Sequence, residues 1–242
     1  MGSLQPVATI GALCRERGIR LHVDAVQVLG HAPIDWSRLP VDLLSGAAHK
    51  LQGPRGIGLL LARRGLPLEP LIGGVQEGGR RGGTESVPLI AGFATALRLC
   101  NQRLDAHGGH DPLARLRDGL WSALRERPGL ERLEVLGPEP GERRLPHHLS
   151  VLVRGQGGRP LSGRAMVRAL ARRGVACGSG SACSARGAAG ASRVLLAMGF
   201  GPEEARAGLR LSVGPWLREE DLAPVPMALA EAIAEVEAGL GR

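Results

Sequence analysis

The sequence predicts an α/β protein made of two domains. Apolar runs alternate with amphipathic stretches along the 242 residues, and this alternation is typical of strands that alternate with helices. The length is sufficient for one or two domains and for a substantial buried core. Hydrophobic residues make up 43% of the chain and charged residues 22%, which is ordinary for a globular protein.

The first domain is predicted to open on a helix from Leu4 to Arg17. Val7, Ile10 and Leu13 share one face of this helix, and Gly18 ends it. The other predicted elements are three buried strands in IRLHVDAVQ, VDLLSGAAH and GIGLLLA, and a long helix over residues 87–103. Three strands are few for a parallel sheet, so we expect an upstream segment to complete this domain.

The composition changes at the segment DAHGGHDP, and we place the domain boundary there, with domains over residues 1–104 and 105–242. The second domain is predicted to contain helices over residues 113–127 and 163–173, a final helix from residue 219 or later to 240, and strands in LEVLG, LSVLVRG and LRLSV. A small-residue loop, CGSGSACSARGAAGAS, precedes short helices. This mixture predicts a small α+β domain.

Bulk properties argue against several classes of protein. No apolar run reaches the roughly 18 residues of a spanning helix, and the first residues lack a signal-peptide pattern, so we expect a cytoplasmic protein. The net charge of +8 and the pI near 10.9 would permit nucleic-acid binding. However, the arginines are scattered and aromatic residues are only 2%, so we consider that role the weakest candidate.

The four cysteines, Cys14, Cys100, Cys177 and Cys183, show neither a CxxC pair nor a zinc-ligand spacing. We therefore expect free thiols and no metal site. His147 and His148 are adjacent, and adjacent residues of a strand point to opposite faces, so they are poor joint ligands. We interpret the two histidines as structural or surface residues.

Lys50 is the only lysine among 31 lysine and arginine residues. It follows the apolar run VDLLSGAA and precedes a turn rich in glycine and proline. Drift from lysine to arginine could leave one surface lysine by chance. However, a guanidinium group replaces an amine only as a charge, because it stays protonated and cannot condense with a carbonyl. The position therefore indicates imine chemistry.

Asp24 lies at the predicted carboxyl end of its strand, where α/β sheets present ligand-binding groups, and Gln27 follows three residues later. Alone, such an aspartate is more often a helix cap or a loop anchor. Together with the pair His49 and Lys50 it suggests pyridoxal phosphate, whose chemistry requires an imine-forming lysine and a carboxylate beside the pyridinium nitrogen. The glycine-rich loop GGRRGGTES adds Arg81, backbone amides and the Thr84 hydroxyl as donors for phosphate, although such a loop alone usually marks a turn.

Five motifs, in the order HVDAVQ, SGAAHKLQGPRGIG, GGVQEGGRRGGTE, GSGSACSA and LRLSVG, closely resemble the pyridoxal-phosphate-dependent cysteine desulfurases of the class V aminotransferase superfamily. The resemblance covers nearly the whole chain. It implies the fold of type I pyridoxal-phosphate-dependent transferases. Residues 1–104 would be the C-terminal part of the cofactor-binding large domain, and residues 105–242 the small domain that carries the nucleophile loop.

The resemblance also implies a role for individual residues. They are Lys50 for covalent attachment of the cofactor and for proton transfer, His49 beside the cofactor phosphate in the catalytic set, Asp24 at the pyridine nitrogen, Gln27 at the ring hydroxyl, Thr84 at the phosphate of the partner subunit, Cys183 as the nucleophile that forms a persulfide, and Arg210 at the substrate carboxylate. Cys183 has small neighbours, which favours an exposed loop, whereas free cysteines are more often buried and inert. We expect Cys14, Cys100 and Cys177 to be such structural thiols.

The implied reaction converts L-cysteine to L-alanine and leaves sulfur on Cys183, for iron-sulfur cluster or thio-cofactor synthesis. The implied partners are a second copy of the chain in a homodimer and a sulfur acceptor or iron-sulfur scaffold protein. A selenocysteine lyase of the same class is an alternative enzyme.

The chain also departs from the family pattern. Members carry a further N-terminal segment with a phosphate-binding turn, a histidine stacked on the cofactor ring and an asparagine near the substrate, and none of these can be assigned here. Ala47 stands where many members have a phosphate-binding serine. We therefore expect a truncated product, a misplaced start or a subunit that pairs with a separate N-terminal fragment. A non-catalytic remnant is the remaining alternative.

Overall fold

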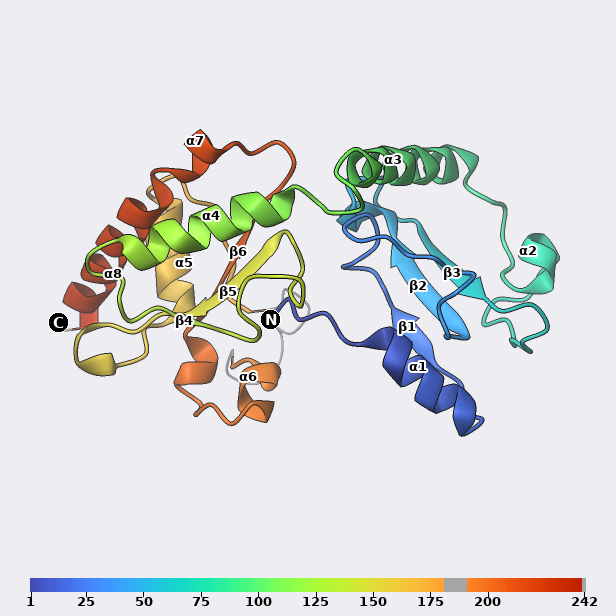
Figure 1. The fold of residues 1–242 in the computed structure, drawn as a ribbon, viewed down its shortest axis with the longest axis horizontal. Coiled ribbons are helices and arrows are strands. Elements are labelled where there is room, and N and C mark those ends of the chain that lie inside the picture. Colours follow the sequence, from blue (N-terminus) through green and yellow to red (C-terminus); the bar gives the residue numbers. More distant parts are fainter. Residues whose placement is uncertain (181–190, 241–242) are drawn as a thin grey trace. The chain divides into compact units, whose positions relative to one another are not determined.

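The computed structural model describes residues 1–180 and 191–240, which form two compact units (Figure 1). Unit 1 comprises Met1–Leu4 and Pro112–Arg242, and unit 2 comprises Gln5–Asp111. The boundary between the units lies between Asp111 and Pro112, the last two residues of the DAHGGHDP segment. Asp111 belongs to unit 2, because its side chain bonds to His31 and Arg103 of that unit. That residues 1–4 belong to unit 1 was not anticipated.

Unit 2 is built on a three-stranded sheet in the order β1 (His22–Asp24), β2 (Leu43–Ala47) and β3 (Gly58–Ala62). Strand β1 runs parallel to β2, with Asp24 opposite Ser45. Strand β3 runs antiparallel to β2, with Gly58 opposite Ala47. The positions of the three strands predicted for this part of the chain are confirmed, each shorter than the apolar run that contains it. Their predicted burial is wrong for two of them, because no residue of β1 or β3 is buried, and only β2 has buried residues, Leu44 and Gly46.

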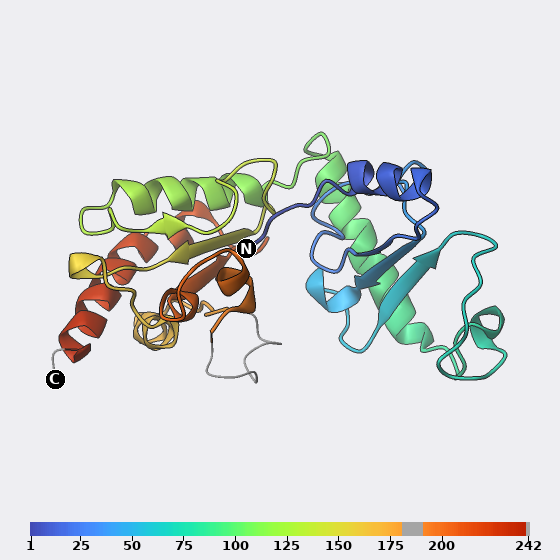
Figure 2. The same ribbon diagram turned by 90° about the horizontal axis from the view of Figure 1, so that it is seen from below.

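The helices of unit 2 are α1 (Val7–Glu16), the short α2 (Gln76–Gly79) and the long α3 (Val87–Asp105). Figures 1 and 2 show α3 lying along one side of the strands. The 3₁₀ turn η1 (Ala48–Lys50) follows β2 directly. A buried apolar cluster joins η1, the loop after β1 and α3 through Leu29, Ala48, Leu51, Phe93 and Cys100.

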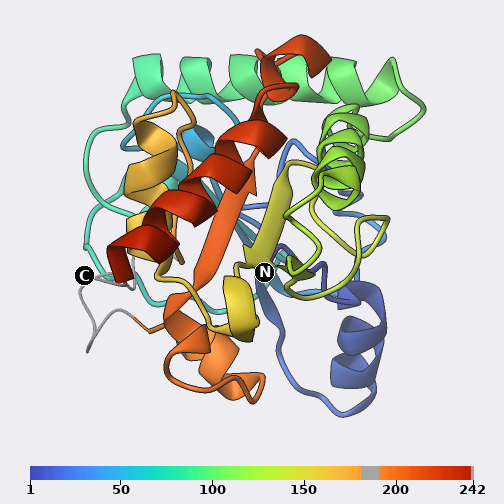
Figure 3. The ribbon, with the colours of Figure 1, turned by 90° about the vertical axis from the view of Figure 1, so that its left-hand side faces the viewer.

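Unit 1 contains an antiparallel sheet in the order β4 (Glu134–Val135), β5 (His148–Leu152) and β6 (Gly208–Ser212). Figure 3 shows α8 (Val225–Leu240) lying across β5 and β6, with α4 (Leu113–Glu126) and α5 (Gly163–Ala171) beside it. The largest buried apolar cluster of the described residues lies between these helices and the sheet. The shorter elements are η2 (Gln156–Gly158), α6 (Arg193–Ala197), η5 (Glu204–Arg206) and α7 (Glu219–Leu222).

The final helix agrees with the prediction of a start at residue 219 or later. Helix α8 begins at Val225, after Pro224, which lacks an amide hydrogen for a helical bond, and the separate short helix α7 ends before it at Leu222. The start of the first helix differs from the prediction. The first helix begins at Val7, not at Leu4. Residues before it are held in unit 1, where the amide of Leu4 donates to the carbonyl of Arg143 at 2.9 Å.

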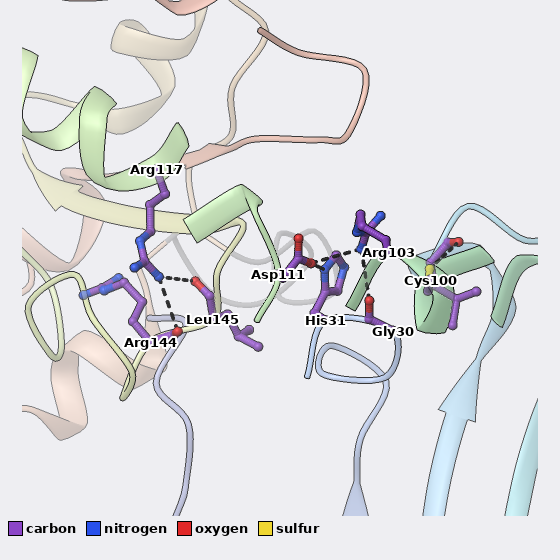
Figure 4. A network of polar contacts seen from close by, with 9 residues as sticks. Gly30, His31, Cys100, Arg103, Asp111, Arg117, Arg144 and Leu145 are labelled. Carbon is purple, nitrogen blue, oxygen red and sulfur yellow. Dashed lines mark hydrogen bonds and ion pairs between the residues drawn. The ribbon is translucent and has the colours of Figure 1, made fainter. Parts of the chain in front are cut away.

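Buried arginines hold the N-terminal segment in unit 1. Arg144 donates from Nη1 to the Met1 carbonyl at 2.8 Å and from Nε to the Pro138 carbonyl at 2.7 Å. Arg117, its neighbour in Figure 4, donates from Nη1 to the Leu145 carbonyl at 2.9 Å. Burial, together with the charge of Arg117, lowers the pKa of Arg144. Carbonyl acceptors thus satisfy a buried guanidinium and fix residues 1–4 to this unit.

None of the helices within the described part of the chain combines the length and apolar character needed to cross a membrane.

Candidate functional site

The turn that carries Lys50 is anchored by its first residue. Ala48 is fully buried (0% exposed), and its carbonyl accepts hydrogen bonds from the amides of Leu51 at 3.1 Å and Gly53 at 2.8 Å. A Cβ at Gly53 would lie 2.9 Å from the Cβ of Ala48, so the returning chain can pass only without a side chain there. This close packing fixes the backbone, while the Lys50 side chain is exposed.

Asp24 lies at the same edge of the sheet as the Lys50 turn. Because β1 and β2 are parallel and Asp24 pairs with Ser45, the carboxyl ends of both strands meet at one edge, and η1 follows β2 there. The Oδ1 atom of Asp24 accepts a hydrogen bond from the amide of Val26 at 2.9 Å. Its Oδ2 atom accepts none from the residues that the structure describes. Asp24 is exposed, so one carboxylate oxygen can receive a ligand.

The neighbouring candidates lie on the two turns that leave this edge. The amide of Ala25, a residue 1% exposed, donates to the Ser45 carbonyl at 2.9 Å and ties the chain after Asp24 to β2. Gln27 follows in this turn and is exposed, as is His49 in η1. The sheet thus gathers four of the candidate residues, Asp24, Gln27, His49 and Lys50, on adjoining turns.

The exposed amine of Lys50 and the exposed carboxylate of Asp24 are suited to the two groups of pyridoxal phosphate that a protein must bind, the aldehyde and the pyridinium nitrogen. A lysine amine can condense with the cofactor aldehyde, and a carboxylate oxygen without an internal partner can pair with the pyridinium nitrogen. Lys50 and Asp24 supply these groups at one edge of the sheet.

The glycine-rich loop differs from its predicted role. The amide of Gly82 donates to the Ile72 carbonyl at 2.9 Å, and the amide of Gly83 donates to Oε1 of Gln76 at 3.0 Å. Arg81 donates to the Gly82 carbonyl next to it. Two amides expected to bind phosphate therefore stabilise the loop itself. Thr84 is exposed, and its hydroxyl stays a candidate donor.

Unit 1 contains a cavity of about 410 Å³ that Arg210 lines. Arg210 lies in β6, and its backbone exchanges hydrogen bonds with Gly178 at 2.6 and 3.0 Å. A Cβ at Gly178 would lie only 3.0 Å from Nη2 of Arg210, so the guanidinium passes directly over that glycine. The small residue lets the charged group lie at the cavity wall.

Cys183 lies outside the described residues. The last residues before that segment, Ser179 and Gly180, and the first residues after it, Ala191 and Ser192, all line the cavity. The residues on both sides of the segment that contains Cys183 therefore line the same cavity as Arg210.

Two of the cysteines expected to be structural are poorly ionised. Burial raises the pKa of the Cys177 thiol to about 11. Cys100 is 6% exposed, its thiol points to the Leu51 carbonyl at 3.9 Å, and burial raises its pKa as well. These two cysteines and Cys14 are free thiols, as predicted for them.

Sequence reasoning missed three residues of the cavity wall, which are His148, Arg164 and Arg206. The register of the sheet gives a signal for the first of them. His148 and Ser150 are two positions apart in β5 and therefore point to the same face of the strand, and Ser150 lies opposite Arg210. Burial, aided by nearby positive charges that include the N-terminal amine, lowers the pKa of His148 to about 3. The imidazole is therefore neutral at pH 7.

Comparison with known sequences identifies the family. The family described as "Aminotransferase class-V" matches residues 1–224. A cysteine desulfurase IscS of Clostridium botulinum is 35% identical over 223 residues, which are 92% of this chain and 54% of that protein. A cysteine desulfurase of Sinorhizobium fredii is 39% identical over 223 residues, with 91% and 54% covered. The chain thus spans about half the length of these relatives.

Solved structures show the same fold. A NifS-like protein from Rickettsia africae superposes with a TM-score of 0.79 at 26% identity, over 98% of this chain and 59% of that one. DndA from Streptomyces lividans gives a TM-score of 0.64 at 31% identity, over 88% and 57%. The predicted fold class is confirmed by these similarities. The chain belongs to the class V aminotransferase family.

Proposed function

We propose that this protein is the C-terminal portion of a pyridoxal-phosphate-dependent cysteine desulfurase, which converts L-cysteine to L-alanine and moves its sulfur to Cys183. The observation that carries the proposal is the placement of the exposed Lys50 and Asp24 at one edge of the parallel pair β1 and β2. The cysteine desulfurases of Clostridium botulinum and Sinorhizobium fredii among its relatives support the choice of substrate.

Residues of unit 2 would hold the cofactor, which supplies an electron sink when it is bound. Lys50 would attach the cofactor through Nζ and, once substrate has displaced it, take up the proton of the substrate Cα at that atom. Asp24 would keep the pyridine nitrogen protonated. Gln27 and His49 would bind the ring hydroxyl and the phosphate, and Thr84 would serve the phosphate of a partner subunit in a homodimer.

Residues of unit 1 would hold the substrate and receive its sulfur. The planar guanidinium of Arg210 suits a bidentate bond to the substrate carboxylate. The Cys183 thiolate would attack the substrate sulfur, so that a sulfur-sulfur bond forms as the carbon-sulfur bond breaks. The products are alanine and a Cys183 persulfide. A sulfur-acceptor or iron-sulfur scaffold protein would then take the persulfide sulfur, and we place this chemistry in the cytoplasm.

The test is alanine formation by the full chain supplied with pyridoxal phosphate and L-cysteine. We expect Cys183→Ser to abolish alanine formation, and Cys177→Ser, the matched control from the same region, to retain it. Equal activity of the two variants would refute the role of Cys183.

A second arm addresses a chain that is inactive alone. Activity that returns on adding the separately produced N-terminal half of a relative would identify a split enzyme. Lack of recovery, with cofactor bound, would show a non-catalytic protein and contradict the proposal.

A further inference from the structure

Strand β5 turns a side chain that is both polar and buried toward the unit 1 cavity. Its neighbours Leu149 and Val151 belong to the apolar core between the sheet and the helices. Because successive residues of a strand point to opposite faces, Ser150 points away from that core. It lines the cavity and is only 5% exposed. The cavity wall therefore contains a hydroxyl group that is almost completely shielded from bulk water.

The Ser150 hydroxyl has no hydrogen-bond partner in the described part of the chain. Two other serines of the wall use their hydroxyls inside the fold. Oγ of Ser162 accepts the amide of Ala165 at 3.4 Å at the start of α5. Oγ of Ser192 accepts the amide of Leu195 at 3.3 Å at the start of α6. Since a buried hydroxyl without a partner is unfavourable, alanine would suit position 150 better unless this hydroxyl binds a ligand.

Arg210 lies directly opposite Ser150 in the sheet. Opposed residues of an antiparallel pair have their side chains on the same face, with Cβ atoms roughly 5 Å apart. Arg210 lines the same cavity, and its guanidinium forms no hydrogen bond or ion pair with the residues that the structure describes. A hydroxyl and a guanidinium that are both free to bind thus face one cavity from adjacent strands.

The other polar residue of this face, His148, is placed differently. Its Nδ1 atom is fully buried without a partner. A Cβ at Gly2 would lie only 2.4 Å from this nitrogen, so the N-terminal segment covers it. The Ser150 oxygen also lacks a partner but is not among the fully buried atoms of this kind, so it is open to the cavity. Ser150 can therefore reach a ligand that Nδ1 of His148 cannot.

We propose that Ser150 is a second binding residue for the carboxylate that Arg210 holds, a role that rests on the proposed function. A carboxylate offers about four acceptor positions. The guanidinium occupies two of them, and the Ser150 hydroxyl donates to a third. This additional hydrogen bond strengthens binding and fixes the orientation of the carboxylate relative to β5 and β6.

The test measures binding of L-alanine, the proposed product, to the full chain without cofactor. A titration followed by nuclear magnetic resonance, on the amide signals of β6, suits the weak binding of so small a ligand. We expect Ser150→Ala to weaken binding of L-alanine about tenfold, as loss of one hydrogen bond to a charged group predicts. L-Alaninamide lacks the carboxylate and should bind equally weakly to both chains.

Stability separates this role from a structural one. Ser150→Ala removes a buried hydroxyl that has no partner, so its urea unfolding midpoint should equal or exceed that of the wild-type chain. Ser150→Thr keeps the hydroxyl and should bind L-alanine like the wild-type chain. A lower midpoint for Ser150→Ala together with unchanged binding of L-alanine would show that the hydroxyl serves only the fold, and would overturn the proposal.

Ser212→Ala is the matched control. Ser212 lies on the same face of β6, two residues after Arg210, but it is exposed and is not among the described residues of the cavity wall. It should leave binding unchanged, and an equal loss in both alanine variants would overturn the proposal. Loss of binding in Arg210→Gln but not in Ser150→Ala would overturn the role of Ser150 alone. Full binding in Arg210→Gln would overturn the roles of both residues.

Discussion

Oδ2 of Asp111 lies 2.8 Å from Nδ1 of His31, and the two side chains are 0% and 9% exposed. Nη2 of Arg103 lies 3.0 Å from the same oxygen and also donates to the Gly30 carbonyl at 3.0 Å (Figure 4). The last residue of unit 2 is therefore bonded both to the loop after β1 and to α3. A carboxylate only accepts, so the imidazole carries its proton on Nδ1.

Removing this buried charge should destabilise unit 2. Asp111→Asn leaves Arg103 without its carboxylate, and breaking a buried pair on one side costs about 3 kcal/mol or more. Urea unfolding followed by circular dichroism measures the change. Asp105→Asn, at the exposed end of α3, is the control and should alter the unfolding free energy by less than about 0.5 kcal/mol. A stable Asp111→Asn variant would show that the cluster contributes little.

Lys50 should be the residue that captures the cofactor. Addition of pyridoxal phosphate should produce a visible absorption band in the wild-type chain and none in Lys50→Arg, because a guanidinium cannot condense with an aldehyde. The only other amine is that of the N-terminus, so borohydride reduction and peptide mass spectrometry will locate the attachment. A label on Met1 in place of Lys50 would contradict the assignment.

Asp24 should affect the chemistry more than the fold. Asp24→Asn keeps an oxygen that accepts from the amide of Val26, so the turn after β1 should survive. The variant loses the charge that holds the ring nitrogen protonated, and alanine formation should fall by roughly 100-fold, as when a preorganised electrostatic group is removed. Thermal unfolding checks the fold. A variant with full activity would show that Asp24 is only a loop anchor.

The chain should lose stability as the pH falls below 6.5. The pKa of His148 is about 3 in the folded protein and near 6.5 when unfolded, so between these values only the unfolded chain binds the proton. The expected loss at pH 5 is about 2 kcal/mol, from the linkage between proton binding and folding. His148→Gln should flatten this pH dependence, whereas His110→Gln, at an exposed position, should leave it unchanged.

Cys177 should resist alkylation in the native protein. A pKa of about 11 leaves a thiolate fraction on the order of 10⁻³ at pH 8. Iodoacetamide labelling followed by peptide mass spectrometry should therefore modify Cys177 slowly, and rapidly once urea unfolds the chain. Equal rates in the two conditions would mean that burial does not control this thiol.

The sequence was informative wherever local pattern determines structure. Apolar runs located the strands, and the parallel pairing of β1 and β2 explains why a strand-end aspartate and a lysine turn share an edge. Contacts between distant residues were not accessible in this way. The pairing of Met1 with Arg144 spans 143 positions, and the approach of α5 to η5 depends on a single glycine, Gly163. The residues of the cavity wall and the internal hydrogen bonds of the Gly82 and Gly83 amides were not predicted for the same reason, because they also depend on contacts between elements.

The docking of Met1–Leu4 onto unit 1 has a consequence for biosynthesis. The ribosome releases these residues before unit 2, whereas Arg144, which binds the Met1 carbonyl, emerges only after the whole of unit 2. Unit 2 can therefore complete its own contacts during translation, whereas residues 1–4 must wait for a binding site that does not yet exist. A fragment that starts at Pro112 would lack the acceptor for one buried guanidinium nitrogen, so unit 1 cannot be excised there without loss.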